Sequence, residues 1–270
     1  MRVQHNMASA NTNRQLGITT GNLSKSTEKL SSGYRINRAG DDAAGLSISE
    51  KMRGQIRGLE QASTNAQDGI SLIQTAEGAL NETHSILQRM RQLAVQASSD
   101  TNVQDDRDAI QKEVTALADE IDRIASQTEF NTMNLLGGSL ANKQIHVGAN
   151  KDQVISITIT TMTTSALLSA TANVSTQSNA EAAISNVNDA LKAVSTQRSA
   201  LGALQNRLEH TIANADNTAE NLQAAESRIR DVDMAKEMVK YSKDNILQQA
   251  AQSMLAQANQ STQGVLSLLQ

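Results

Sequence analysis

The stretch that decides the fold of this chain is residues 59–97, LEQASTNAQDGISLIQTAEGALNETHSILQRMRQLAVQA. Apolar and small side chains recur there in alternating steps of three and four residues: Leu59, Ala62, Ala66, Gly69, Ile73, Ala76, Leu80, Thr83, Leu87, Met90, Ala94 and Ala97. This spacing is typical of a long helix that packs along other helices. A second row follows at seven-residue intervals: Leu72, Ala79, Ile86 and Leu93. The two rows together make a stripe wide enough to contact more than one partner helix.

Two more segments carry the same periodicity. One follows a polar break at residues 98–102 and contains Ile110, Val114, Leu117, Ile121 and Ile124; it is expected to form an antiparallel hairpin with the first helix. The other spans residues 180–229, where polar residues such as Arg198 and Glu226 interrupt an otherwise apolar seam. Such polar members either fix the register of the helices or mark points where the seam meets water.

The two ends of the chain are also amphipathic. Leu16, Leu23 and Leu30 are spaced seven apart near the start, and an apolar stripe near the end consists of Leu247, Ala250, Ala251, Met254, Leu255 and Ala258. Neither end can bury its stripe alone, so the terminal helices are expected to pair. The link at residues 31–42 is rich in Gly and Ser and closes with Asp41 and Asp42, which are suited to cap the next helix.

Between residues 143 and 160 the period changes to two. Two β-rich runs flank a Gly/Asn/Asp turn at residues 148–152, which predicts a β-hairpin. The fold class is therefore mainly α: an elongated coiled-coil rod of long helices with one small β-hairpin, plus paired terminal helices. The expected segments are an N-terminal helix and connector, the first two rod helices, the hairpin, a loop, the C-terminal rod helix and the C-terminal helix, at residues 1–42, 43–142, 143–160, 161–179, 180–232 and 233–270.

Composition excludes several classes of function. Of the 270 residues 39% are hydrophobic but only 1% aromatic, and Trp, Pro and Cys are absent. A wide core with an aromatic-lined pocket is therefore not expected, and without Cys there is neither a disulfide framework nor a thiolate metal site. The net charge of -4 provides no positive field for nucleic acid. No apolar run is long enough for membrane insertion, and Met1–Met7 does not have the pattern of a cleaved secretory signal.

No group of residues indicates catalysis or a cofactor. His5, His84, His146 and His210 are scattered without metal-ligand spacing. Three aspartates at 105, 106 and 108 lack the Gly and Glu of a calcium loop and instead suit the start of a helix. The glycines at 40 and 45 are not followed by a phosphate-loop lysine. We expect no enzyme, no metal and no cofactor.

Several motifs resemble those of bacterial flagellins. The N-terminal signature is residues 30–46, LSSGYRINRAGDDAAGL, and the others, in the order of that family, are residues 65–71, 77–82, 127–131, 147–150, 225–233 and 266–269. They are spread over nearly the whole chain. The short middle resembles flagellins that lack large central variable domains, because only about residues 140–180 separate the helical halves.

The resemblance implies a structural subunit that self-polymerises into the extracellular filament for swimming motility, with the terminal helices in an inner tube. It implies that the self-assembly residues are Leu16, Leu23, Leu30, Leu247, Ala251, Met254, Leu255 and Ala258. The implied partners are other copies of the chain, the flagellar export apparatus and an export chaperone, and the filament cap and hook-associated proteins. A hook–filament junction protein, which shares flagellin-like ends, is the alternative.

The resemblance also implies recognition by the flagellin-sensing Toll-like receptor of animal hosts. The matching stretch is residues 88–96, where Arg89 is a multidentate donor and Leu93 an apolar plug, with Glu113 on the adjacent helix. Many family members carry Glu where this chain has Gln92. Taken without the family, Arg89 and Glu113 would be ordinary members of a solvated helix face.

Overall fold

The computed structural model describes residues 6–168 and 172–267 and contains six helices and four strands over those ranges. The helices are α1 (Met7–Ser32), α2 (Ala43–Ala97), α3 (Gln104–Gln127), α4 (Thr164–Leu167), α5 (Gln177–Arg230) and α6 (Met234–Ser267). The strands are β1 (Glu129–Phe130), β2 (Met133–Asn134), β3 (Lys143–His146) and β4 (Val154–Ile157). Two compact units contain them: a terminal unit, Met1–Gly54 with Asn221–Gln270, and a rod unit, Gln55–Glu220.

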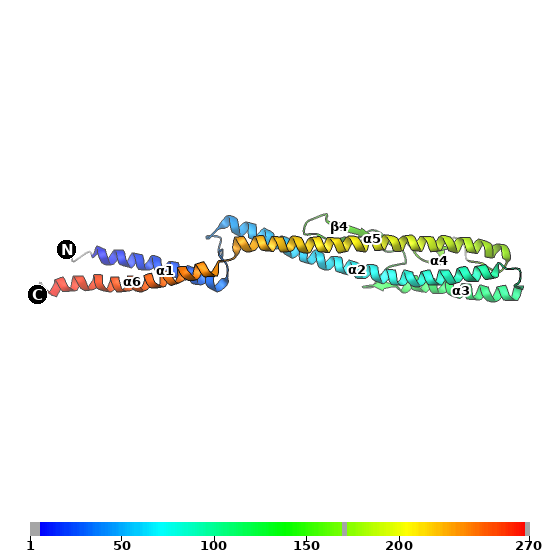
Figure 1. Ribbon diagram of the computed structural model, residues 1–270, viewed down its shortest axis with the longest axis horizontal. Helices are drawn as coiled ribbons and strands as arrows, with labels where there is room; N and C mark the ends of the chain where they lie inside the picture. The colour runs from blue at the N-terminus through cyan, green and yellow to red at the C-terminus, as the bar shows by residue number, and fades with distance from the viewer. Residues whose placement is uncertain (1–5, 169–171, 268–270) are drawn as a thin grey trace. The chain divides into compact units, whose positions relative to one another are not determined.

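In the rod unit, α2, α3 and α5 lie alongside one another around a continuous apolar core (Figure 1). Every seam member of α2 from Ala62 to Ala97 is buried, which confirms the predicted periodicity. On α3, Ile110, Val114 and Ile121 are buried, and no predicted seam member of α5 is exposed. The coiled-coil rod follows from the heptad spacing, because helices with one apolar stripe bury it against each other.

The predicted β-hairpin is confirmed, and the rod unit contains a second, shorter one. The predicted hairpin is β3–β4, with Lys143 opposite Ile157 and His146 opposite Val154. The other, β1–β2, is joined by Asn131 and Thr132, whose φ angles of 49° and 61° are left-handed. A two-residue turn with positive φ at both positions matches the twist of antiparallel strands. Strands of two residues are too short for an alternating pattern to reveal them.

The segment at residues 161–179, expected to be a loop, contains the short helix α4. It is hydrogen-bonded to side chains of α3. Asp122 accepts hydrogen bonds from the backbone N–H of Thr164 at 2.8 Å and from its hydroxyl at 2.6 Å. Gln111 accepts from the N–H of Val174 at 2.6 Å and donates to the carbonyl of Ala172 at 3.3 Å. Side chains of α3 thus satisfy backbone groups of this segment, while Leu167, Leu168 and Val174 are buried.

In the terminal unit, α1 and α6 lie side by side and antiparallel, as the amphipathic ends predicted (Figure 1). Asn6 donates to the carbonyl of Ala258 at 2.9 Å, and Ser9 donates to Asn259 at 2.8 Å. At the other end of the pair the two connectors form an antiparallel bridge between Tyr34 and Asp231. In the region described, no helix is long and apolar enough to cross a membrane.

Candidate functional site

Exposed apolar side chains are concentrated on the terminal unit. Among the described residues, thirteen large hydrophobic side chains are exposed, and nine of them belong to this unit. Six lie on α6: Met234, Met238, Val239, Ile246, Leu247 and Met254. A surface this rich in apolar side chains is costly to leave in water and marks an interaction site.

The two most exposed large apolar residues of α6, Val239 and Ile246, lie on the side of the helix away from α1. Ile246 and Leu255 are nine residues apart, which puts them on nearly opposite sides of a helix. Leu255 is half-buried, whereas Ile246 is 66% exposed. Val239 lies seven residues before Ile246 on the same line and is 71% exposed. We call Val239, Ile246, Leu247 and Met254 the outer face of α6.

The eight predicted assembly residues separate into two groups. Leu16, Leu23 and Leu30 on α1 and Ala251, Leu255 and Ala258 on α6 are half-buried. Leu247 and Met254 are 45% and 56% exposed and belong to the outer face. The stripe read from the sequence as one surface is therefore two, one between α1 and α6 and one open to another molecule.

The connectors of the terminal unit are held by a cluster around Tyr34. The guanidinium of Arg230 lies 4.7 Å from the ring centroid of Tyr34 and that of Arg53 lies 5.6 Å from it. Arg53 also donates to the Tyr34 hydroxyl at 3.2 Å and forms an ion pair with Glu226 at 3.3 Å. Glu226, 8% exposed, accepts a further hydrogen bond from Ser49 at 2.9 Å. Glu226 is thus one of the polar seam members, and here it is buried and paired.

Sequence reasoning predicted the capping but not this cluster. Asp42 accepts a hydrogen bond from the N–H of Gly45 at 2.8 Å in the first turn of α2, as expected of a cap. The pKa of Asp41 is lowered because its carboxylate accepts backbone hydrogen bonds from Arg38 and Asn37. The arginines around Tyr34 come from positions far apart in the chain, so no local motif indicates them; the rarity of aromatic residues is the only signal.

Arg89 and Glu113 lie together on the rod unit. Two guanidinium nitrogens of Arg89, Nε and Nη2, donate to Oε1 of Glu113 at 2.9 and 2.7 Å, and both side chains are about half exposed. Leu93 is only 2% exposed and belongs to the core. The structure therefore brings Arg89 and Glu113 together at the surface, whereas Leu93 does not present an apolar plug there, because it lies in the second apolar row of α2.

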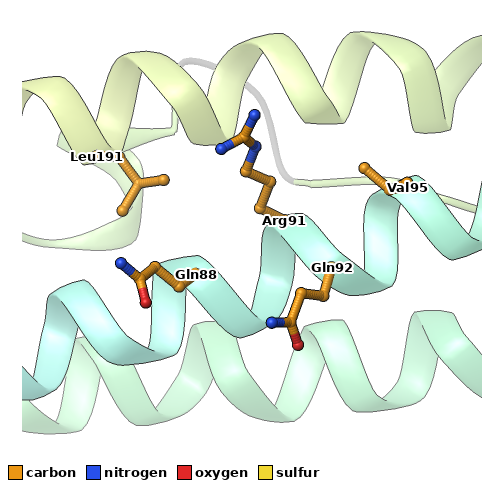
Figure 2. Close-up of a pocket in the computed structure, with 5 residues that line it drawn as sticks. All are labelled: Gln88, Arg91, Gln92, Val95 and Leu191. Atoms are coloured by element: carbon orange, nitrogen blue, oxygen red, sulfur yellow. The ribbon is translucent and has the colours of Figure 1, made fainter.

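The same stretch of α2 borders a groove on its other side. Figure 2 shows Gln88, Arg91, Gln92 and Val95 of α2 with Leu191 of α5 around an open pocket of about 490 Å³. The side chain of Arg91 extends toward α5. The predicted receptor stretch thus presents two separate surfaces, one shared with α3 and one shared with α5.

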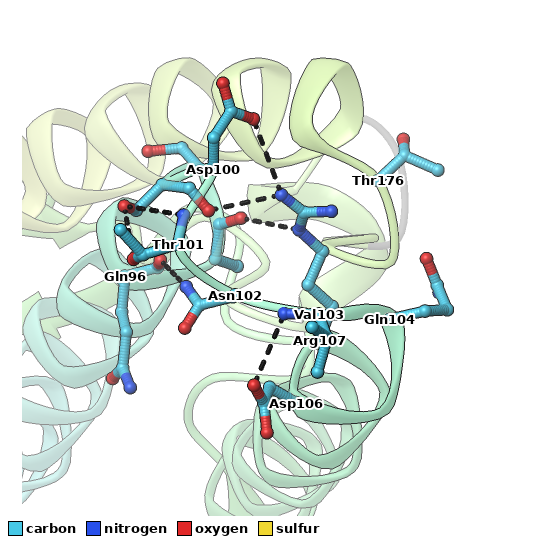
Figure 3. A network of polar contacts seen from close by, with 12 residues as sticks. Gln96, Asp100, Thr101, Asn102, Val103, Gln104, Asp106, Arg107 and Thr176 are labelled. Carbon is cyan, nitrogen blue, oxygen red and sulfur yellow. Dashed lines mark hydrogen bonds and ion pairs between the residues drawn. The ribbon is translucent and has the colours of Figure 1, made fainter.

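Polar contacts close the turn between α2 and α3 (Figure 3). Arg107 donates to the carbonyls of Ala97 and Ser99 at 3.1 and 3.2 Å, at the C-terminal end of α2. Asp106 accepts from the N–H of Val103 at 3.3 Å and so caps α3, as expected of an aspartate at a helix start. Among the described residues no group of three or more His, Cys, Asp or Glu side chains is arranged to hold a metal ion.

Comparison with known proteins identifies the family. The bacterial flagellin N-terminal helical region matches residues 3–141, and the C-terminal helical region matches residues 184–269. This chain belongs to the flagellin family. It is 58% identical to a flagellin of Halalkalibacterium halodurans over 271 residues and 53% identical to one of Bacillus subtilis over 304 residues, covering both chains completely in each case.

Solved structures agree with this assignment. A crystal structure of Bacillus cereus flagellin matches with a TM-score of 0.51 and 33% identity, over 60% of this chain and 94% of that one. A putative flagellar hook-associated protein of Vibrio parahaemolyticus shares the fold, with a TM-score of 0.60 over 71% of this chain, but only 13% identity. The full-length identity to flagellins favours the filament subunit over the hook–filament junction protein.

Flagellin is the structural subunit of the extracellular flagellar filament and serves motility; it is not an enzyme. The match to a flagellin of equal length also supports the short form, in which the two hairpins and the segment fastened to α3 occupy the middle of the chain.

Proposed function

We propose that this flagellin polymerises through the outer face of α6, which is the feature of the structure that most needs a partner. Val239 and Ile246 are 71% and 66% exposed on a helix whose opposite side is already occupied by α1. Burying one such side chain contributes roughly 1.5–3 kcal/mol. Burial of these residues at every subunit would therefore favour association of neighbouring copies.

The polymer grows without limit because its contacts are heterologous. When one patch meets a different patch on the next copy and the rotation does not close a ring, the product is an open helical filament. The paired termini are the expected place for this contact, and their folding and their assembly are then coupled: a helix pair with an uncovered apolar face gains stability when a neighbour covers that face.

The substitution Ile246→Asp tests the proposal. A carboxylate introduced at the outer face loses its hydration if that face is covered in the filament, so seeded polymerisation is expected to fail. Gln252→Asp is the matched control, because it introduces the same charge at an exposed polar position of the same helix. Filaments from Ile246→Asp at wild-type yield would refute this use of the outer face.

The same face explains the proposed cytoplasmic partners. An apolar row on α6 would aggregate before export, so an export chaperone is expected to cover it. The chain then passes through the flagellar export apparatus, and the filament cap and the hook-associated proteins are its further proposed partners. The absence of disulfides and prolines suits passage of an unfolded chain.

Recognition by the flagellin-sensing Toll-like receptor is proposed for the surface at Arg89 and Glu113. Their exposed side chains supply a planar cation and a carboxylate on neighbouring helices. Leu93, buried beneath them, is assigned the role of holding α2 in place. Arg89→Ala is expected to weaken receptor binding without loss of helix content, whereas Arg123→Ala removes an exposed arginine from α3 and serves as the control. Unchanged binding by Arg89→Ala would rule out the site.

A further inference from the structure

The contact between α1 and α6 buries a carboxylate. Asp244 is only 7% exposed, and within Met234–Gln260 it is the one residue of α6 that is buried. Its Oδ2 atom is shielded from solvent and has no hydrogen-bond partner among the described residues. Glu237, on the same helix, differs because its carboxylate lies 3.4 Å from the ammonium group of Lys240.

The facing side of α1 is polar at the same depth. Its two buried residues are Thr19 and Ser26, whereas Leu16, Leu23 and Leu30 are only half-buried. Thr19 satisfies its own hydroxyl by donating to the carbonyl of Gln15 at 2.9 Å. A stable coiled coil places Leu, Ile or Val at the positions that are most deeply buried. The centre of this helix pair therefore holds the residues least suited to stabilise it.

A buried carboxylate oxygen without a hydrogen-bond partner has a definite thermodynamic effect. Removing a charge from water is unfavourable unless a partner replaces the lost hydration. The unfolded chain hydrates Asp244 fully, so its burial favours separation of α1 and α6. The polar contacts at the ends of the pair, such as Asn6 with Ala258, do not replace that hydration, because they lie far along the helix.

We propose that Asp244 keeps the α1–α6 pair weak in the isolated subunit, so that the two helices pair firmly only where neighbouring subunits cover the outer face of α6. The inference rests on the proposed mode of polymerisation. A pair that folded firmly on its own would present Val239 and Ile246 as a formed apolar surface before a filament end was available. A weak pair postpones that surface until it can be buried.

The test compares Asp244→Ala with Ser242→Ala in the full-length monomer. Residues 242 and 244 are close together on α6, and Ala raises helix propensity at either position. Ser242 is exposed and uncharged, so only Asp244→Ala removes a buried charge. Helix content is followed by circular dichroism during titration with trimethylamine N-oxide, which favours burial, and hydrogen exchange locates the gain. For Asp244→Ala we expect the helices to form at a lower concentration of trimethylamine N-oxide than in the wild type. Amide protection in α1 and α6 should rise about tenfold. Ser242→Ala should change both the midpoint of this titration and the amide protection much less.

The inference would be overturned if the midpoint of the trimethylamine N-oxide titration were unchanged or higher for Asp244→Ala. A shift of that midpoint no larger than the shift for Ser242→Ala would overturn it too. This readout uses monomers and is independent of filament growth. If Ile246→Asp still polymerises normally, the proposed assembly face fails, whereas the effect of Asp244 on the helix pair is judged by the titration alone.

Discussion

The guanidinium of Arg230 stacks on the ring of Tyr34, with 4.7 Å between its central carbon and the ring centroid. Tyr34 lies in the connector between α1 and α2, and Arg230 ends α5 just before the connector to α6. The backbones pair there as well: Arg35 N–H donates to the carbonyl of Arg230 at 2.6 Å, and Val232 N–H donates to that of Gly33 at 3.0 Å. The aromatic ring and the backbone bridge together fix where α1 and α6 begin to run alongside each other.

Replacing Tyr34 is expected to loosen the connectors. Tyr34→Leu removes both cation–π contacts, and we expect a loss of about 1 kcal/mol of local stability. Tyr34→Phe keeps the ring and loses only the hydrogen bond from Arg53, so its effect should be smaller. Hydrogen exchange at Arg35 and Val232 measures both. If Tyr34→Leu and Tyr34→Phe lowered local stability equally, stacking of the arginines on the ring would contribute nothing to that stability.

Two glycines of α2 should respond oppositely to the same substitution. A Cβ at Gly69 would lie 2.3 Å from Cδ1 of Ile145 in β3, whereas a Cβ at Gly78 meets nothing within 4 Å. Gly69→Ala should force the end of the Ile145 side chain out of its place against α2 and so lower the free energy of unfolding. Gly78→Ala should raise it by up to about 1 kcal/mol, because Ala has the higher helix propensity. Urea unfolding of both variants checks this, and a stabilising Gly69→Ala would contradict the packing of the hairpin on α2.

Thr132 is strained in the turn of β1–β2. Its φ of 61° is unfavourable for a β-branched residue and suits glycine. Thr132→Gly should therefore stabilise the rod unit by about 1 kcal/mol. Glu129→Gly changes an exposed strand residue with ordinary backbone angles and should destabilise it. Thermal unfolding of the two variants measures these effects. A lower Tm for Thr132→Gly than for the wild type would contradict the strain assigned to Thr132.

The terminal unit should weaken in acid through two capping aspartates. The pKa of Asp233 is lowered mainly by the backbone hydrogen bond from Lys236 at 3.1 Å, and that of Asp41 by the backbone hydrogen bonds from Arg38 and Asn37. A carboxyl whose folded pKa lies below its unfolded value adds stability above the unfolded pKa, about 3.9, and loses it as pH falls through the folded pKa.

Helix content between pH 6 and pH 2 measures this effect. Asp41→Asn and Asp233→Asn should each reduce the loss of helix content at low pH, and the double variant should reduce this loss further. A double variant with the acid transition of the wild-type protein would show that other groups cause the loss.

How far the sequence predicts this structure depends on the length of each pattern. The seam of α2 repeats over many heptads, so the burial of Leu80, Leu87 and Met90 follows from spacing alone. The turn at Asn131 and Thr132 joins strands of two residues, which is too short for any periodicity.

The outer face of α6 could not be separated from the inner one for a different reason. Apolar residues occur around most of that helix, so Leu247 and Met254 fit the same i, i+3, i+4 pattern as Ala251 and Leu255. Only the position of α1 decides which are covered. The same holds for Leu93, whose place in the second apolar row fits either a core residue or a surface contact until the partner helices are known.

Seeded polymerisation observed by electron microscopy, with circular dichroism recorded before and after, tests the central claim most directly. The account predicts long thin filaments from the wild-type chain with a gain in helix signal, and no filaments after deletion of residues 247–270, although the rod unit stays helical. Filaments from the truncated chain, or only monomers and short capped oligomers from the wild type, would contradict polymerisation through the terminal helices.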